Sequence, residues 1–270
     1  MAVCLTPASI KTPEKLQQKE QSLYMRVPCG SCPSCLQKRS GMWVFRLQQE
    51  QKVSVSSHFL TLTYSEENLP HTQCGRPTLV RRDHQLFMKR LRKYEKNAKI
   101  KYYAVGEYGS NTERPHYHSI IFNVENVDNI PKAWQLGNVQ VDKCTTASMA
   151  YVAKYVNKQT KFKDRNDPRT PEFSLMSKGL GSAFMTKAQR KYMKQHLNPF
   201  ITHVGGQKVA LPRYYKDKIF TDAEKEIINT KSKLHYEEQK PFESFKHQQD
   251  YVADQFRKRD KIARAKRNKI

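Results

Sequence analysis

The stretch Arg114-Pro-His116-Tyr-His118-Ser-Ile-Ile-Phe122 decides the expected fold and site. Its aromatic and branched residues favour a strand, and side chains alternate between the two faces of a strand. His116 and His118 should therefore project side by side, while Tyr117 faces the other way. Two imidazoles on one strand face form half of a site for a divalent metal ion. The alternative is two unrelated surface histidines.

A carboxylate precedes this strand. Residues 100–107 predict another strand, and the loop YGSNTERP between the two is rich in turn formers. If the two strands pair as a hairpin, Glu107 can reach the same ion. Two histidines and one carboxylate leave positions open for substrate oxygens. Without an ion, Glu107 would be a solvated strand end.

The surrounding pattern predicts an α+β domain with helices packed on one face of an antiparallel sheet. Before residue 160 we expect strands at 57–64, 100–107, 116–124 and 138–142. We expect one helix at 36–52, a second that begins at Asp83 as its N-cap, and a third from Thr145 or Thr146 to about Gln159. Beyond it we expect a tight turn in LMSKGLGSAFM (175–185), helices at 187–197 and 222–233, and a helix-permissive stretch at 243–270. These elements divide the chain into a Cys-rich segment with a helix (1–54), a central domain (55–200) and a basic, mostly helical C-terminal region (201–270).

Composition points to nucleic acid. The 270 residues hold 49 Lys and Arg against 25 Asp and Glu, a net charge of +24, which attracts polyanions. With 37% hydrophobic residues, 14 Tyr and 12 Phe, the chain does not read as disordered. No apolar run is long enough to span a membrane, and the N-terminus lacks a signal-like apolar stretch.

Candidate DNA contacts lie at basic and aromatic positions. The basic ones are Lys89, Arg90, Arg92, Lys93 and Arg114, together with the tail 257–270. The run 89–93 can instead be the solvated face of a helix. Tyr64 and Tyr108 are candidates for stacking on bases, whereas Phe122 is expected in the core.

A pair of tyrosines supplies candidate nucleophiles. In YVAKYVNK (151–158), Tyr151 and Tyr155 share one helix face, and Lys154 and Lys158 share a neighbouring one. A phenol is a poor nucleophile at its ordinary pKa of about 10, and a nearby ammonium favours the phenolate or steadies a phosphate. The alternative is an amphipathic helix with its tyrosines in the core.

Cysteines cluster near the N-terminus. Cys29, Cys32 and Cys35 offer three thiolates, and Cys4 is the expected fourth ligand of a structural Zn²⁺ site. Reduced thiols and an iron–sulfur cluster are the alternatives. Cys74 and Cys144 are isolated and expected to be ordinary thiols.

Five segments in order resemble the HUH endonucleases, and most closely the replication initiation proteins of the Microviridae of gokushovirus type. They are VPCGSCPSC (27–35), FLTLTYSEENLP (59–70), GEYG (106–109), RPHYHSIIF (114–122) and YVAKYVNK (151–158). MSKGLGSAF (176–184) resembles a further family loop but lacks its usual Pro-Gly-Ile-Gly-like sequence.

The resemblance implies a phage replication initiator that acts in the host bacterial cytoplasm with Mg²⁺ or Mn²⁺. One tyrosine would nick single-stranded origin DNA to give a 5′-phosphotyrosine and a 3′-OH for rolling-circle synthesis, and the second would allow the displaced strand to be closed. The chain has no G-x-x-x-x-G-K-[ST] motif, so a host helicase, with a host polymerase, is the expected partner. The alternatives are a non-enzymatic zinc-containing single-stranded DNA-binding protein and a plasmid initiator or relaxase. Relaxases usually bring a third histidine, and none lies close to His116 in the sequence.

Overall fold

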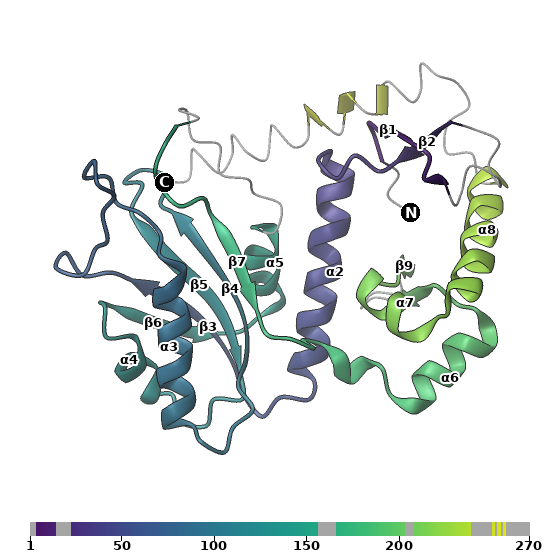
Figure 1. Cartoon of the computed structure of the whole chain (residues 1–270). Helices are drawn as coiled ribbons and strands as arrows, with labels where there is room; N and C mark the ends of the chain where they lie inside the picture. The colour runs from purple at the N-terminus through teal and green to yellow at the C-terminus, as the bar shows by residue number, and fades with distance from the viewer. Residues whose placement is uncertain are drawn as a thin grey trace. The chain divides into compact units, whose positions relative to one another are not determined.

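A computed structural model describes residues 4–14, 23–155, 166–202 and 208–238, and, near the C-terminus, 250, 251, 253, 254, 256 and 257 (Figure 1). The chain divides into two compact units. One is Arg39–Phe184, and the other combines Met1–Lys38 with Met185–Ile270. These units do not coincide with the segments 1–54, 55–200 and 201–270, which stay a prediction.

A five-stranded antiparallel sheet forms the centre of the unit Arg39–Phe184. Its order is β6-β3-β5-β4-β7. The strands are β3 (Ser57–Thr63), β4 (Lys101–Tyr108), β5 (Pro115–Phe122), β6 (Val139–Lys143) and β7 (Phe173–Met176). The α+β class and the antiparallel sheet are confirmed, and the sequence missed only the short strand β7 of these five.

Helices cover both faces of this sheet, so the expectation of helices on one face was wrong. One face packs against α3 (Arg81–Tyr94) and α4 (Asn129–Trp134), and the other against α2 (Pro33–Gln51) and α5 (Thr146–Lys154) (Figure 1). The central strand β5 shows why. Ile120 and Ile121 point to opposite faces, and both are fully buried. A strand with apolar residues on both faces needs cover on both.

Two local predictions on the α3 side are also corrected. Helix α3 begins at Arg81 with Val80 as its N-cap, so Asp83 is not the cap. Asp83 instead accepts a hydrogen bond from the Tyr64 hydroxyl at 2.6 Å. Tyr64 and Tyr108 are only 2% and 9% exposed, so neither can stack on bases. Both rings belong to the buried core, and Phe122 is buried as predicted.

Helix α5 begins where the sequence indicates. The Thr145 hydroxyl accepts a hydrogen bond from the backbone N–H of Ser148, and the Ser148 hydroxyl accepts one from the backbone N–H of Thr145. This capping box satisfies two N–H groups that the helix leaves unpaired and confirms Thr145 as the cap. The predicted continuation to Gln159 runs into residues 156–160, which lie outside the described part of the chain.

The expected turn in 175–185 is confirmed. Gly179 and Gly181 have φ values of +68° and +75°, and a short 3₁₀ helix, η1 (Ser182–Phe184), follows. Leu180 between them is fully buried, and its carbonyl oxygen accepts hydrogen bonds from Arg46 of α2 at 3.0 and 3.1 Å. The loop is thereby fixed to the same core that holds α5.

Apart from the start of α2 and the helical residues near the C-terminus, the described residues of the other unit form two small antiparallel strand pairs and three helices. They are β1 (Ala8–Lys11) with β2 (Tyr24–Val27), β8 (Phe200–Thr202) with β9 (Lys208–Ala210), α6 (Lys187–His196), α7 (Arg213–Ile219) and α8 (Asp222–Glu238). The helices predicted at 187–197 and 222–233 are confirmed by α6 and α8, and α7 and α8 give the predicted C-terminal region its helical character. Most of the stretch 243–270 lies outside the described residues.

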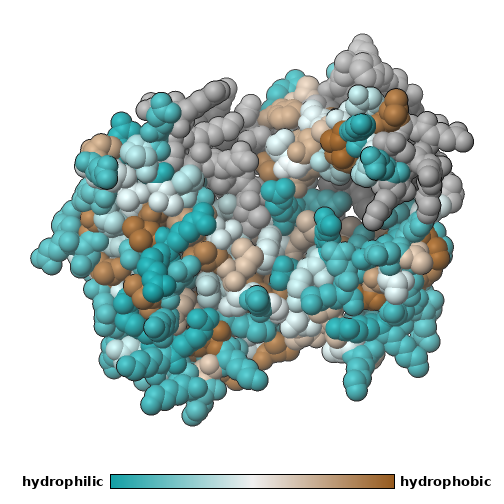
Figure 2. Space-filling model, viewed as in Figure 1, coloured by the Kyte–Doolittle hydropathy of each residue, from teal (hydrophilic) through white to brown (hydrophobic). Residues whose placement is uncertain are grey.

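The surface agrees with the charge count. On the face shown in Figure 2, hydrophilic residues dominate both units and hydrophobic residues are scattered among them. Among the described residues, no helix combines the length and apolarity that a membrane span requires.

Candidate functional site

Three candidate metal ligands meet on the α5 side of the sheet. Strands β4 and β5 pair as the expected hairpin, and Glu107 lies directly opposite His116. His116 Nε2 is 2.7 Å from Glu107 Oε1, and His118 Nε2 is 3.2 Å from the same oxygen. One donor atom from each residue falls within 4.8 Å of the others. The sheet register therefore produces the set of two imidazoles and one carboxylate expected from the sequence.

Contacts at the Nδ1 atoms orient the two imidazoles. The Thr61 hydroxyl lies 3.1 Å from Nδ1 of His118, and the Arg114 carbonyl oxygen lies 3.1 Å from Nδ1 of His116. The ring of Phe59 stacks on His118, with 5.3 Å between centroids and 10° between planes. These contacts leave both Nε2 atoms directed at Glu107. Such outer contacts commonly fix the tautomer and angle of metal-binding histidines.

Sequence reasoning missed Thr61 and Phe59. Both lie on β3, where Thr61 is opposite His118 and Phe59 is opposite Ile120 of β5. Alternation within β3 indicates that the two residues share a face. The sequence offered no signal, however, that β3 pairs with β5 in this register, and without that pairing neither residue can be assigned to the histidines.

The tyrosine pair comes from α5. Met149, Val152 and Ala153 are fully buried against the sheet, which turns the adjacent face of the helix toward the histidines. The Tyr151 hydroxyl donates a hydrogen bond to Glu107 Oε1 at 3.0 Å and lies 3.5 Å from His118 Nε2. The Tyr155 hydroxyl in turn donates to the Tyr151 oxygen at 3.0 Å. The shared face predicted for the two tyrosines is confirmed.

The protonation of this network is asymmetric. Burial raises the pKa of Glu107, but hydrogen bonds with His116 and His118 outweigh it and hold the pKa below its ordinary value. Burial, with the Glu107 charge, raises the pKa of Tyr151 to about 12, and burial also raises the pKa of Tyr155. Both phenols are therefore protonated at neutral pH, beside an ionised carboxylate.

Lys154 lies close to the first of the two phenols. Its ammonium is 5.9 Å from the centre of the Tyr151 ring, and the side chain is exposed at the end of α5, where solvent screens its charge. Burial and the Glu107 charge set the raised pKa of Tyr151, and the role expected for Lys154 stays a prediction. Lys158 lies outside the described residues.

The predicted DNA-contacting residues do not gather around the tyrosines. Lys89, Arg92 and Lys93 are exposed on α3, which packs on the opposite face of the sheet from α5. Arg90 donates to the carbonyl oxygens of Ala133 and Trp134, at 2.7 and 3.2 Å, and so stabilises the end of α4.

Arg114 is held nearer the histidines. Its guanidinium pairs with Glu66 at 2.6 Å and donates to the Tyr64 carbonyl oxygen at 2.8 Å. These bonds fix the backbone whose carbonyl faces His116. The basic tail is outside the described residues beyond Arg257.

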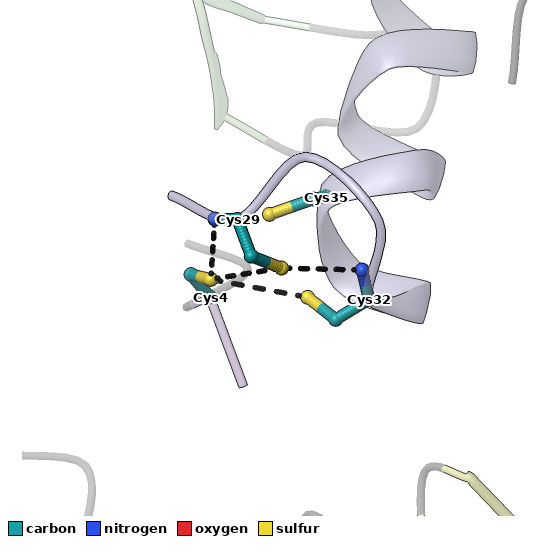
Figure 3. Close-up of side chains that lie close together, drawn as sticks. All are labelled: Cys4, Cys29, Cys32 and Cys35. Carbon is teal, nitrogen blue, oxygen red and sulfur yellow. Dashed lines mark hydrogen bonds between the residues drawn. The ribbon is translucent and has the colours of Figure 1, made fainter. Parts of the chain in front are cut away.

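A second cluster lies in the other unit and consists of four cysteines (Figure 3). Cys4 Sγ is 3.6 Å from Cys29 Sγ and 3.9 Å from Cys32 Sγ, and Cys35 completes a group within 4.8 Å. The structure therefore brings the predicted fourth cysteine to the other three. Cys74 is exposed and Cys144 is buried, both away from this group.

The thiols of Cys29 and Cys35 differ in acidity. The Thr6 hydroxyl donates to Cys29 Sγ at 3.3 Å and lowers the pKa of that thiol to about 5. Burial raises the pKa of Cys35 to about 12.

Comparison with known proteins places these features in a family context. Residues 57–160 match a family model for replication-associated proteins of the ORF2 type. The chain is 31% identical over 211 residues to "Replication-associated protein ORF2" of Spiroplasma virus 4, which covers 70% of this chain and 66% of that protein. It is 29% identical to "Replication-associated protein ORF4" of Chlamydia phage 1, over 71% of this chain and 53% of that protein.

A third relative is "Replication-associated protein VP4" of Bdellovibrio phage phiMH2K, at 28% identity over 70% of this chain and 66% of that protein. The chain thus spans 53% to 66% of the length of these relatives. No solved structure matches the chain. The matched region 57–160 contains all three residues of the histidine–carboxylate cluster and both tyrosines.

Proposed function

Because the chain is related to the replication-associated proteins of the Microviridae, we propose that it initiates phage replication by nicking single-stranded origin DNA through a tyrosine. The observation that carries this proposal is the contact between the Tyr151 hydroxyl and Glu107 Oε1 at 3.0 Å. It places a candidate nucleophile against a group of two histidines and one carboxylate. The same carboxylate oxygen lies 2.7 Å from His116 Nε2, so the phenol and the candidate metal ligands share one site.

The three residues fit a divalent cation. Oε2 of Glu107 is buried and accepts no hydrogen bond from the part of the chain that the structure describes. An orphaned buried carboxylate oxygen is costly, and a cation satisfies it. We therefore propose that His116, His118 and Glu107 hold Mg²⁺ or Mn²⁺, which supplies Lewis-acid polarisation of a phosphate oxygen when bound.

The chain's own residues account for the remaining roles. The Tyr151 oxygen attacks phosphorus and loses its proton, and the bond from phosphorus to the 3′ oxygen breaks. The leaving oxygen takes up a proton and becomes the 3′-OH, while the 5′ phosphate stays on the tyrosine. Lys154, beside the Tyr151 ring, is suited to bind a nonbridging phosphate oxygen rather than to deprotonate the phenol. A role for Lys158 rests on the sequence alone.

Two tyrosines allow the strand to be rejoined. With Tyr151 joined to DNA, the adjacent Tyr155 hydroxyl can attack a second origin copy. The released 3′-OH can then attack the first phosphotyrosine, which restores a phosphodiester and a free phenol. The 3.0 Å between the two hydroxyl oxygens makes alternation possible without moving the helix far. We assign the first attack to Tyr151, which contacts both Glu107 and His118.

Rolling-circle replication also requires strand unwinding and DNA synthesis. We propose, from the relation to phage replication-associated proteins, that a host helicase unwinds the DNA and a host polymerase extends the 3′-OH. This activity would take place in the host bacterial cytoplasm. Phosphate contacts would come from exposed basic residues of the +24 chain.

The test is a denaturing gel of the full chain with labelled single-stranded origin DNA, with and without Mn²⁺ or Mg²⁺. We expect a metal-dependent covalent adduct with the fragment that lies 3′ of the nick, and none from the Tyr151→Phe/Tyr155→Phe double variant. Reversible binding without an adduct, on several phage origins that a known nickase cuts, would instead favour a non-enzymatic DNA-binding protein.

A further inference from the structure

We propose that Cys4, Cys29, Cys32 and Cys35 bind one Zn²⁺ as a closed structural site, which ties the N-terminal segment to the start of α2. This site is separate from the histidine–carboxylate cluster and goes beyond the proposed nicking function. Cys4 comes from the N-terminal segment, and Cys29 and Cys32 precede α2. Cys35 lies in the first turn of that helix (Figure 3).

The spacing of the sulfurs fits tetrahedral zinc. With Zn–S distances of about 2.3 Å, the sulfurs of a regular tetrahedron lie about 3.8 Å apart. The Cys4 sulfur lies 3.6 Å from that of Cys29 and 3.9 Å from that of Cys32. A disulfide needs about 2.05 Å between sulfurs, so these pairs are not bonded to each other. The four side chains converge on one point in Figure 3.

Backbone N–H groups point at the sulfurs as well. The N–H of Cys29 donates to Cys4 Sγ at 3.3 Å, and that of Cys32 donates to Cys29 Sγ at 3.3 Å. The N–H of Leu5 donates to Cys32 Sγ at 3.5 Å. Four thiolates around one Zn²⁺ carry a net charge of about −2, and such donors offset it. The turn that arranges them depends on Gly30, whose φ of +74° a residue with a Cβ rarely adopts.

The strands next to the cysteines bury little of their own surface. Strand β1 is exposed along its whole length, and β2 is exposed at alternate residues. A two-stranded sheet without a covered face is marginal in water. A metal bound by Cys4 and by the cysteines at 29–35 would cross-link the chain on both sides of this hairpin. Its binding free energy would then stabilise the folded hairpin, as a structural metal does in a small domain. All four ligands come from the chain, so no position is left for a substrate.

The experiment measures zinc in the full-length protein, in a His116→Ala/His118→Ala background that removes the other candidate metal site. We expect one zinc per chain by mass spectrometry of the metal, released by an organomercurial that consumes four thiols per ion. Cys4→Ser should weaken zinc binding, in competition with a chromogenic chelator, by at least about 10-fold, since losing even a residue that only orients a ligand costs about 10- to 100-fold. Cys74→Ser, which removes an exposed thiol outside the cluster, should leave it unchanged.

Three results would overturn the proposal. They are the absence of bound metal in protein made with zinc present, iron with visible absorbance in place of zinc, and unchanged zinc binding by Cys4→Ser. If Cys4→Ser does not fold, Co²⁺ substitution of the unaltered cysteines decides the question. Tetrahedral thiolate ligation gives intense visible bands and sulfur-to-metal charge transfer, and octahedral oxygen ligation gives neither. None of these readouts depends on nicking, so failure of the nickase proposal leaves them interpretable.

Discussion

Replacing each tyrosine separately should have unequal effects. In Tyr155→Phe, the Tyr151 oxygen keeps its contacts with Glu107 and His118 and loses one hydrogen bond from a neutral donor. Such a bond is worth about 0.5–1.5 kcal/mol, which corresponds to about a 2- to 13-fold change in the rate of the first cleavage. The first cleavage should therefore survive in Tyr155→Phe, while rejoining is lost.

Tyr151→Phe removes the oxygen that touches the cluster. The remaining phenol oxygen lies 3.0 Å from that position. A misplacement of about 1 Å can cost about 100-fold in rate, so we expect the first cleavage to slow by at least about 100-fold. The benzene ring of Phe preserves the packing against Phe59 and His118, which keeps the comparison free of a cavity effect.

The assay is single-turnover adduct formation with Mn²⁺ on an oligonucleotide labelled 3′ of the nick, quenched in denaturant. Fluorescence anisotropy of the same oligonucleotide should show unchanged binding by both variants, and Tyr192→Phe, an exposed tyrosine of the other unit, should behave as the parent. Equal loss of the first cleavage in Tyr151→Phe and Tyr155→Phe would refute the order of attack. A surviving adduct in the double variant would refute the nucleophiles themselves.

Three further predictions concern residues around the core. Thr61→Val removes the hydroxyl beside Nδ1 of a ligand histidine and should weaken Mn²⁺ binding about 10- to 100-fold by calorimetric titration, with unchanged circular dichroism. Burial lowers the pKa of His84 from 6.5 to about 3. Between pH 6.5 and 3 the unfolded chain therefore binds more protons than the folded chain, so the free energy of unfolding falls as the pH is lowered through this range. In His84→Gln, the free energy of unfolding measured with urea should depend less steeply on pH, by up to about 1.4 kcal/mol per pH unit. A Cβ at Gly137 would lie 2.3 Å from the Thr63 carbonyl oxygen, so Gly137→Ala should lower Tm. Gly41 lies on α2 with open space around it, so Gly41→Ala should add about 0.5–1 kcal/mol to the free energy of unfolding. Melting curves equal to that of the parent protein would contradict both predictions.

The sequence predicts the site better than its surroundings because the site depends on short-range geometry. Alternation places His116 and His118 on one face, and a hairpin brings Glu107 opposite His116. The helical spacing of four residues stacks Tyr151 on Tyr155. Each of these relations spans fewer than ten residues and follows from strand or helix geometry alone.

Longer-range relations could not be read in the same way. Placing α3 and α5 on opposite faces depends on which strand face each helix covers. The adjacent buried pair Ile120 and Ile121 was a usable signal of two-sided cover, since one-sided sheets alternate apolar and polar residues. The run at 89–93 carries no such signal, because charged residues on an exposed helix face look the same whichever side of the sheet they lie on.

The two candidate metal sites should respond differently to chelation because they differ in how their ligands are held. His116, His118 and Glu107 lie on neighbouring strands, and the pairing of these strands in a buried sheet sets the positions of the three ligands. Cys4, in contrast, lies 25 residues before Cys29, and the two strands between them are largely exposed. Removing a weakly held Mg²⁺ or Mn²⁺ should therefore stop nicking with little change in Tm. Removing Zn²⁺ should instead increase amide hydrogen exchange in β1 and β2, and exchange that increased equally in β4 and β5 would show that the cysteine site does not act locally.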